Sequence, residues 1–79
     1  MLKLQDIRKR SGLSQSELSH RSGVKLRTIQ EYENGRRKID NAHVDTLISI
    51  AEVLEVPFYE LMEDAQRINQ IKENVKREA

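Results

Sequence analysis

Residues 12–36 of this chain read GLSQSELSHRSGVKLRTIQEYENGR. Ser14 and Glu17 have the spacing of a capping box, in which each side chain accepts a hydrogen bond from the other residue's backbone amide at the start of a helix. A helix is therefore predicted to begin at Gln15. Gly23 is predicted to end it, because glycine adopts the left-handed conformation that follows many helices at no steric cost.

A second short helix is predicted at residues 26–33. Ile29 and Tyr32 are three apart and share its buried face, and Gly35 follows its end. Two short helices joined by a glycine turn have the spacing of a DNA-binding helix-turn-helix, whose second helix enters the major groove. An ordinary corner between two packed helices has the same spacing, so both interpretations stay open at this point.

The flanking sequence predicts further helices. An earlier amphipathic helix ends at Gly12, and a later helix begins between Asn41 and His43. The inward side chains of that later helix are expected to be Val44, Leu47, Ile48, Ala51 and Leu54. Pro57 suits the first position of a fifth helix. The apolar side chains of this fifth helix are Phe58, Leu61 and Met62.

The last part of the chain is more polar. Residues 1–63 are interpreted as one domain, and residues 64–79 as a polar amphipathic helix or tail. The thin apolar stripe of this tail consists of Ala65, Ile68, Ile71 and Val75. Three interpretations of this tail stay open: its apolar stripe forms a dimer contact, the stripe packs against residues 1–63 of the same chain, or the helix frays.

Charge is distributed unevenly along the chain, although the net charge is only +1. Residues 1–38 hold ten Lys or Arg against four Asp or Glu, whereas residues 39–62 hold five Asp or Glu and no Lys or Arg. Residues 63–79 hold four of each sign. Chance clustering is one explanation, and a basic surface for a polyanion such as nucleic acid is the other.

Composition argues against several other classes of function. The 79 residues accommodate one domain, and the absence of Cys excludes a disulfide framework. His20 and His43 have no cluster of ligands around them, so neither a metal site nor a cofactor is expected. No nucleophile–base set or phosphate loop indicates an enzyme, and no small-molecule ligand is expected. No segment resembles a signal peptide or a membrane span, and we expect a cytoplasmic protein.

The motif resembles the Cro/repressor-type (Xre) helix-turn-helix family. The matching positions are Gly12 to Ser19, Gly23-Val24, Thr28-Ile29, Tyr32 to Arg36, Thr46-Leu47, Ile50-Ala51, Leu54, Val56 and Glu60-Leu61. This resemblance covers about residues 2–62. It implies an all-α, compact five-helix fold of the lambda-repressor-like type with a C-terminal helical extension, and it implies binding to operator DNA, usually to repress transcription.

The resemblance also assigns roles to single positions. Those expected to read bases, on the recognition helix and just before it, are Lys25, Leu26, Arg27, Thr28, Gln30 and Glu31. Those expected to contact phosphates are Gln15, Asn34, Arg36, Arg37 and Lys38. Arg27 suits the O6 and N7 acceptors of guanine, whereas Glu31 either accepts from a cytosine amine or pairs with Arg27 four residues earlier.

Three further points follow from the resemblance. Arg8 and Glu33 match positions that form a partly buried, structural ion pair. Lys25 stands where the family usually has a Ser or Thr cap, and its side chain cannot accept a hydrogen bond. Glu55 stands where glycine usually follows the fourth helix, so a strained backbone is expected there.

Two functions remain open on this evidence. The first is a transcriptional repressor that binds a palindromic operator as a homodimer, because one domain covers only a few base pairs. The tail and the surface around residues 56–58 are its candidate dimer contacts. The second is a protein-interaction module on the same fold, such as an antirepressor, an antitoxin-like partner or an adaptor.

Overall fold

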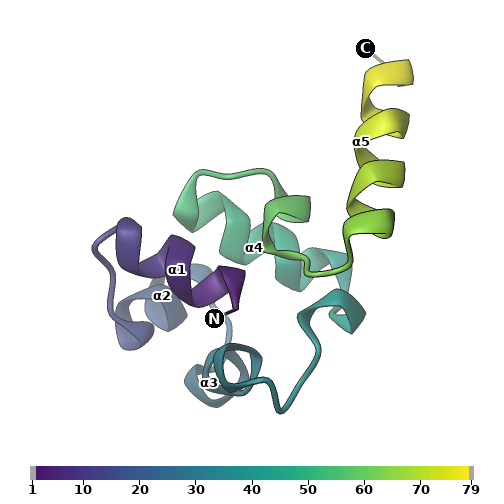
Figure 1. The fold of residues 1–79 in the computed structure, drawn as a ribbon. Coiled ribbons are helices and arrows are strands. Elements are labelled where there is room, and N and C mark those ends of the chain that lie inside the picture. The colour runs from purple at the N-terminus through teal and green to yellow at the C-terminus, as the bar shows by residue number, and fades with distance from the viewer. Residues whose placement is uncertain (1, 79) are drawn as a thin grey trace.

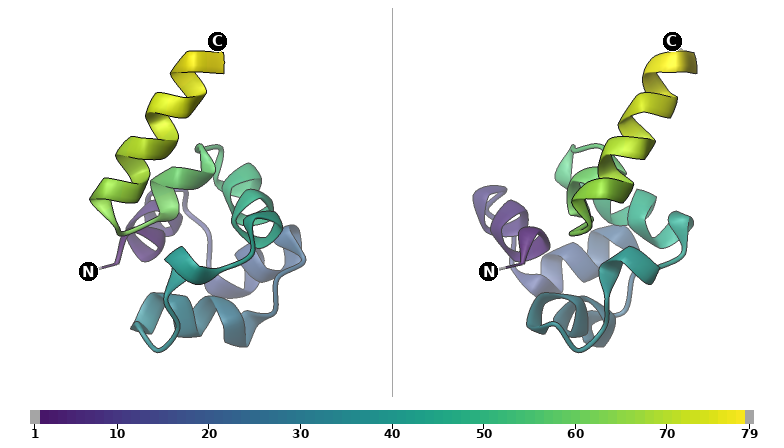
Figure 2. Two further views of the ribbon diagram at one scale, coloured as in Figure 1. Left: turned by 90° about the vertical axis from the view of Figure 1, so that its right-hand side faces the viewer. Right: turned by 45° about the vertical axis from the view of Figure 1, so that its right-hand side comes forward.

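The computed structural model describes residues 2–78, with side chains as far as residue 75. Within this range every regular element is helical, which confirms the predicted all-α class. The α-helices are α1 (Lys3–Arg10), α2 (Gln15–Ser22), α3 (Leu26–Asn34), α4 (Val44–Leu54) and α5 (Ala65–Glu78). Two short 3₁₀ helices are η1 (Ile39–Asn41) and η2 (Phe58–Leu61). Helices α1 to α4 surround one core, and α5 projects away from it (Figures 1 and 2).

Helix α2 begins and ends where the sequence predicts. The Glu17 amide donates to Ser14 Oγ at 3.0 Å, and the Ser14 amide donates to Glu17 Oε1 at 3.1 Å. Gly23 follows the helix in the left-handed conformation, with φ of 76°. The capping box is thus confirmed, and it fixes where the first helix of the motif starts.

The capping box predicts a pH dependence of stability. Hydrogen bonds from the Ser14 amide and hydroxyl lower the pKa of Glu17 below its usual 4.5. Since the folded pKa is the lower one, the stabilisation is complete above pH 4.5 and is lost as the pH falls through the folded value. Urea unfolding of wild type and Glu17→Gln at pH 7 and pH 3 should show wild type losing its advantage at pH 3. An advantage of equal size at both pH values would contradict this.

The core is built from one face of each helix. Its fully buried side chains are Leu4, Leu18, Ile29, Ile50, Leu61 and Met62. They come from α1, α2, α3, α4 and the η2 region, so each element within residues 4–62 except η1 contributes one of them. The core thereby fixes the angle at which α3 leaves α2.

The predicted inward face of α4 is partly wrong. Leu47, Ala51 and Leu54 are buried, but Val44 and Ile48 are 53% and 39% exposed. The stripe that packs runs through Leu47, Ile50 and Leu54, and Ile48 lies about 100° around the helix from Leu47. Val44 is the first residue of the helix, at the edge of the core.

Glu55 ends α4 in the left-handed conformation, with φ of 57° and ψ of 42°. It is the only residue other than glycine with positive φ in the described chain. The strain expected at this position is therefore present, because a β-carbon crowds the following carbonyl in this region.

Replacing Glu55 by Gly should stabilise the domain by about 1 kcal/mol, because removal of the β-carbon relieves more strain than the freer unfolded chain costs. For a domain of this size the melting temperature should rise by about 4–8 °C. Thermal unfolding followed by circular dichroism checks this. Glu55→Ala is the control, since it removes the carboxylate and keeps the β-carbon, and it should give no gain. Equal gains from both variants would contradict the backbone explanation.

The predicted fifth helix after Pro57 is only a 3₁₀ turn, and α5 lies in the segment predicted as a C-terminal helix or tail. Residues 58–61 form only the 3₁₀ helix η2, with Pro57 immediately before it. The Met62 amide donates to the Tyr59 carbonyl, and Met62 itself is extended, so the chain leaves η2 after one turn. Asp64 then starts α5, because its Oδ1 accepts hydrogen bonds from the Gln66 and Arg67 amides at 3.0 and 3.2 Å.

Candidate nucleic-acid interface

The turn between α2 and α3 is fixed by two serine hydroxyls. Ser19 Oγ donates to the Val24 carbonyl at 2.6 Å, and the Val24 amide donates to Ser22 Oγ at 3.2 Å. Lys25 precedes α3 and makes no side-chain capping bond, as expected from its lack of an acceptor. The bond from Ser19 ties the turn to α2, and α3 follows at the surface of the molecule (Figure 1).

Helix α3 has a buried face and an outward face. Ile29, Tyr32 and Glu33 are buried. The outward face carries residues 27, 31 and 34, at helical spacings of four and three. The side chains of Lys25, Arg27 and Gln30 are exposed, whereas those of Leu26, Thr28 and Glu31 are half-buried.

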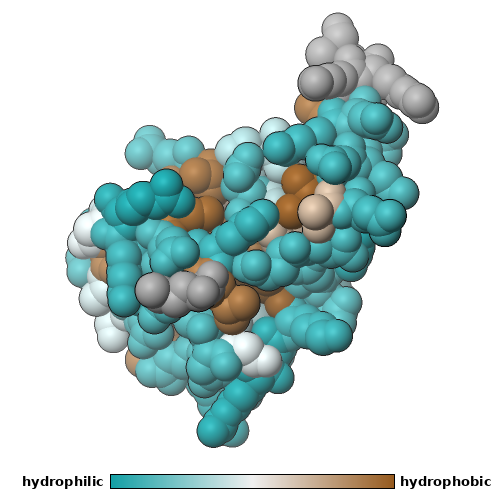
Figure 3. Space-filling view, in the orientation of Figure 1, coloured by the Kyte–Doolittle hydropathy of each residue, from teal (hydrophilic) through white to brown (hydrophobic). Residues whose placement is uncertain are grey.

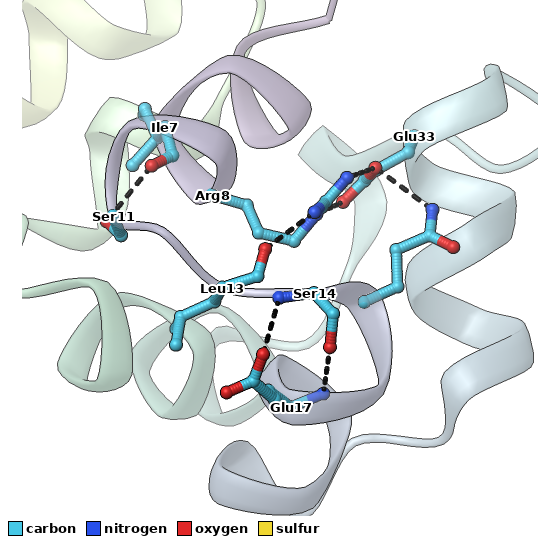
Figure 4. Close-up of polar contacts among 8 residues, drawn as sticks. Ile7, Arg8, Ser11, Leu13, Ser14, Glu17 and Glu33 are labelled. Carbon is cyan, nitrogen blue, oxygen red and sulfur yellow. Dashed lines mark hydrogen bonds and ion pairs between the residues drawn. The ribbon is translucent and has the colours of Figure 1, made fainter.

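An ion pair joins α1 to the buried face of α3. Arg8 Nε and Nη2 donate to the two carboxylate oxygens of Glu33 at 2.7 and 2.9 Å, and Arg8 Nη1 donates to the Leu13 carbonyl at 2.7 Å. Both side chains are nearly covered, with 8% and 2% of their surfaces exposed. The hydrogen bond with Glu33 raises the pKa of Arg8 against the opposing effect of burial, so Arg8 stays charged. Figure 4 shows the two side chains facing one another between their helices.

Gln15, predicted to contact a phosphate, is drawn into this ion pair. Its Nε2 donates to Glu33 Oε1 at 3.1 Å, and the side chain is half-buried. Gln15, the first residue of α2, therefore helps to hold the carboxylate of Glu33 on α3 in place. One amide hydrogen and the amide oxygen of Gln15 remain for other partners.

The basic loop Arg36–Lys38 is folded back along α3. Asn34 Oδ1 accepts from the Arg36 amide at 3.0 Å, which turns the chain just after Gly35. Arg37 Nη2 then donates to Glu31 Oε1 at 3.0 Å. The predicted alternative for Glu31, a pair with Arg27, is therefore wrong. Arg37 of the loop forms a salt bridge with Glu31, whereas Arg27 of α3 does not.

A groove of about 740 Å³ lies between α3 and the basic loop. Its basic lining residues are Lys25, Arg36, Arg37 and Lys38. No lining residue of this groove, within the described chain, is acidic. Lys25, predicted to read bases, and the loop residues Arg36–Lys38, predicted to contact phosphates, thus share one positively charged groove.

Three polar residues of the same groove were not predicted from the sequence. Asn41, His43 and Thr46 line its far side. They reach it because η1 turns the chain back toward α3 after the basic loop. In the sequence they lie three, five and eight residues after Lys38, and this proximity to the basic run is a signal that could have identified them.

Two kinds of site are absent from the described residues. No group of three or more His, Cys, Asp or Glu in this range lies close enough to hold a metal ion. No helix within the same range is long and apolar enough to cross a membrane. In the view of Figure 3 hydrophobic atoms reach the surface only in small, separate patches.

A fixed turn, a buried face that holds α3 at the surface, and a basic groove beside it define a helix-turn-helix domain. The protein-family model described as Helix-turn-helix matches residues 4–61, and the chain belongs to this Cro/repressor-type, Xre-like family. It is a DNA-binding helix-turn-helix regulator. Searches among curated proteins and among solved structures found no match.

Proposed function

We propose that this chain represses transcription by binding a palindromic operator as a homodimer, with α3 in the major groove of each half-site. The observation that carries the proposal is the groove beside α3, which four basic side chains line and no acidic one does. DNA phosphates are the polyanion that such a surface attracts. The proposal includes no catalytic activity, no cofactor and no small-molecule ligand, and it places the protein in the cytoplasm.

Base reading is proposed for the exposed edge of α3. Arg27 is exposed, and no acidic side chain among the described residues forms a salt bridge with it. Its guanidinium is therefore free to bind guanine O6 and N7 in a bidentate manner. The neighbouring side chains proposed to face base edges are Lys25, Leu26, Thr28, Gln30 and Glu31.

Phosphate contacts are proposed for the two ends of the motif. Arg36 and Lys38 are exposed and border the groove. Asn34 is exposed beside them, although its side-chain oxygen is occupied by the Arg36 amide. Gln15 would use its remaining amide hydrogen at the start of α2. Such contacts orient α3 on the duplex and carry no sequence information of their own.

Selection of bound duplexes from a random pool tests this function most fully. A repressor of this kind should enrich one palindrome whose half-sites are about one helical turn apart. Two chains should bind per duplex. Recovery of unenriched sequences would contradict sequence-specific binding, and enrichment of one half-site with one chain bound would contradict the homodimer.

Residues 64–79 are proposed as an extension that contributes to the dimer. Ile68 is buried against the domain and Ile71 is half-buried, but Val75 on the same stripe is 49% exposed. Lys72 Nζ lies 5.6 Å from the centre of the Tyr59 ring, so α5 contacts residues 1–63 as far as its middle. The outer part of the stripe is thereby presented at a fixed angle to a second copy.

Replacing Val75 by Asp should weaken the dimer about tenfold or more, because a buried apolar contact of this size contributes about 1.5 kcal/mol or more. The melting temperature of the monomer should not change, since Val75 is already half exposed. Analytical ultracentrifugation measures the dimer. Asn74→Asp adds the same charge at the neighbouring exposed position and should leave the dimer intact. If both variants remain dimeric, α5 is not part of the dimer interface.

A protein-interaction module is the second candidate function. Val44 and Ile48 on α4 are exposed, Asp45 follows Val44, and Glu52 lies one helical turn after Ile48. These side chains do not line the basic groove. An apolar and acidic surface suits a basic partner protein. Failure to bind any duplex, together with retained folding, would favour this second function over the first.

A further inference from the structure

We propose that Arg37 is a positioning residue for α3, which acts by holding and neutralising Glu31, and that it is not a phosphate contact. The inference rests on the proposed DNA binding. Arg37 Nη2 donates to Glu31 Oε1 at 3.0 Å, and the two side chains are 55% and 23% exposed. The carboxylate is thus partly covered by an arginine that stays in water.

The turn after α3 builds this pair through the backbone as well as the side chain. The Arg36 amide is taken by Asn34 Oδ1 at 3.0 Å. The next amide, that of Arg37, donates to the Glu31 carbonyl at 3.2 Å. Both the main chain and the guanidinium of Arg37 are therefore anchored on the same residue, so the pair does not depend on one flexible side chain alone.

Glu31 without Arg37 would interfere with DNA binding in two ways. Its carboxylate lies on the outward face of α3, where phosphates would repel it. It also stands four residues after Arg27, the spacing at which oppositely charged side chains pair on a helix. An unheld Glu31 would draw the Arg27 guanidinium away from the base edge that we propose it reads.

Arg37 reduces both effects at once. It offsets the negative charge of Glu31 and holds Oε1 toward the loop, so Glu31 attracts Arg27 less strongly than an unpaired carboxylate would. The held carboxylate still has lone pairs for the N4 amine of a cytosine. Of the three basic loop residues, Arg36 and Lys38 then remain for phosphates, since neither forms a salt bridge within the described part of the chain.

The test compares four proteins on the duplex selected by wild type: wild type, Arg37→Ala, Glu31→Gln and the double variant. Affinity is measured by fluorescence anisotropy over a range of salt concentrations, with Arg36→Ala as the matched control. Arg37→Ala should weaken binding about tenfold, through the loss of the Arg27 base contact. The double variant should recover most of that loss, because the amide introduced by Glu31→Gln carries no charge to repel DNA or capture Arg27.

The salt dependence distinguishes this role from a phosphate contact. Arg36→Ala should reduce the slope of log affinity against log salt by about 0.9, the value for one phosphate neutralised. Arg37→Ala should change it by clearly less. A double variant as weak as Arg37→Ala, with a slope reduced as in Arg36→Ala, would overturn the positioning role and leave the proposed function standing. Absence of binding by folded wild type would overturn the proposed function itself.

Discussion

Replacing Glu33 by Ala should lower the free energy of unfolding by about 3 kcal/mol, the largest effect on stability expected of any single substitution considered for this chain. Arg8 would keep its charge in a nearly covered position, where Glu33 now supplies both of its carboxylate partners. Removal of one member of a buried pair leaves the other uncompensated, and that desolvation dominates the cost. Urea unfolding at pH 7 measures the change.

A double variant, Arg8→Met with Glu33→Leu, is the informative control. It removes both charges and keeps apolar volume, so it should recover much of the stability that Glu33→Ala loses. Gln15→Ala removes only the weaker third partner, at 3.1 Å, and should cost about 1 kcal/mol. A loss of less than about 1 kcal/mol for Glu33→Ala would show that the pair is not effectively buried in solution.

Replacing Arg27 by Ala should reduce affinity for the selected operator by about 1–3 kcal/mol, or roughly 5- to 150-fold. The reason is the loss of two parallel hydrogen bonds to guanine at the exposed start of α3. Preference for that base pair should disappear with the affinity. Competition binding with duplexes mutated at each position, one at a time, measures both quantities.

Two controls separate base reading from simple charge. Arg27→Lys keeps the positive charge but not the planar fork, so it should keep binding to random DNA and lose the base preference. Arg10→Ala removes an equal charge from an exposed position on α1 and should change affinity little. Unaltered base preference in Arg27→Ala would mean that another side chain of α3 reads this position.

Features governed by a few consecutive residues were predictable from the sequence. The capping box at Ser14 and Glu17 and the left-handed Gly23 depend on side chains and backbone only a few residues apart. The positive φ of Glu55 was predictable from the resemblance, because the family usually has glycine at this position. The all-helical class follows from these local signals together with the apolar periodicity.

Features that depend on how segments pack were predicted less well. Val44 and Ile48 have the right hydrophobicity for a core, but the stripe that α2 and η2 cover passes beside them. Helix periodicity gave no means of choosing between Ile48 and Ile50. The chain after Pro57 makes only one 3₁₀ turn, because Met62 is extended and Asp64 starts a new helix.

In the candidate site, too, local features were predictable and contacts between distant segments were not. Each basic residue of the groove could be identified from charge and from its position in the motif, but their partners could not. Gln15 bonds to Glu33 across 18 positions, and Glu31 bonds to Arg37 beyond a turn. Both contacts are set by the path of the chain in three dimensions, and both change what those side chains have left to offer DNA.

The salt dependence of DNA binding tests the central claim, that the outward face of α3 and the basic groove beside it bind DNA. Affinity for the selected duplex and for a scrambled duplex of equal length should be measured between 50 and 200 mM salt, about the range over which phosphate contacts weaken. Both affinities should fall steeply, with a slope of about −0.9 for each phosphate neutralised, and the selected duplex should bind about a thousandfold more tightly or better. Equal affinity for the two duplexes, or affinity unaffected by salt, would contradict the claim.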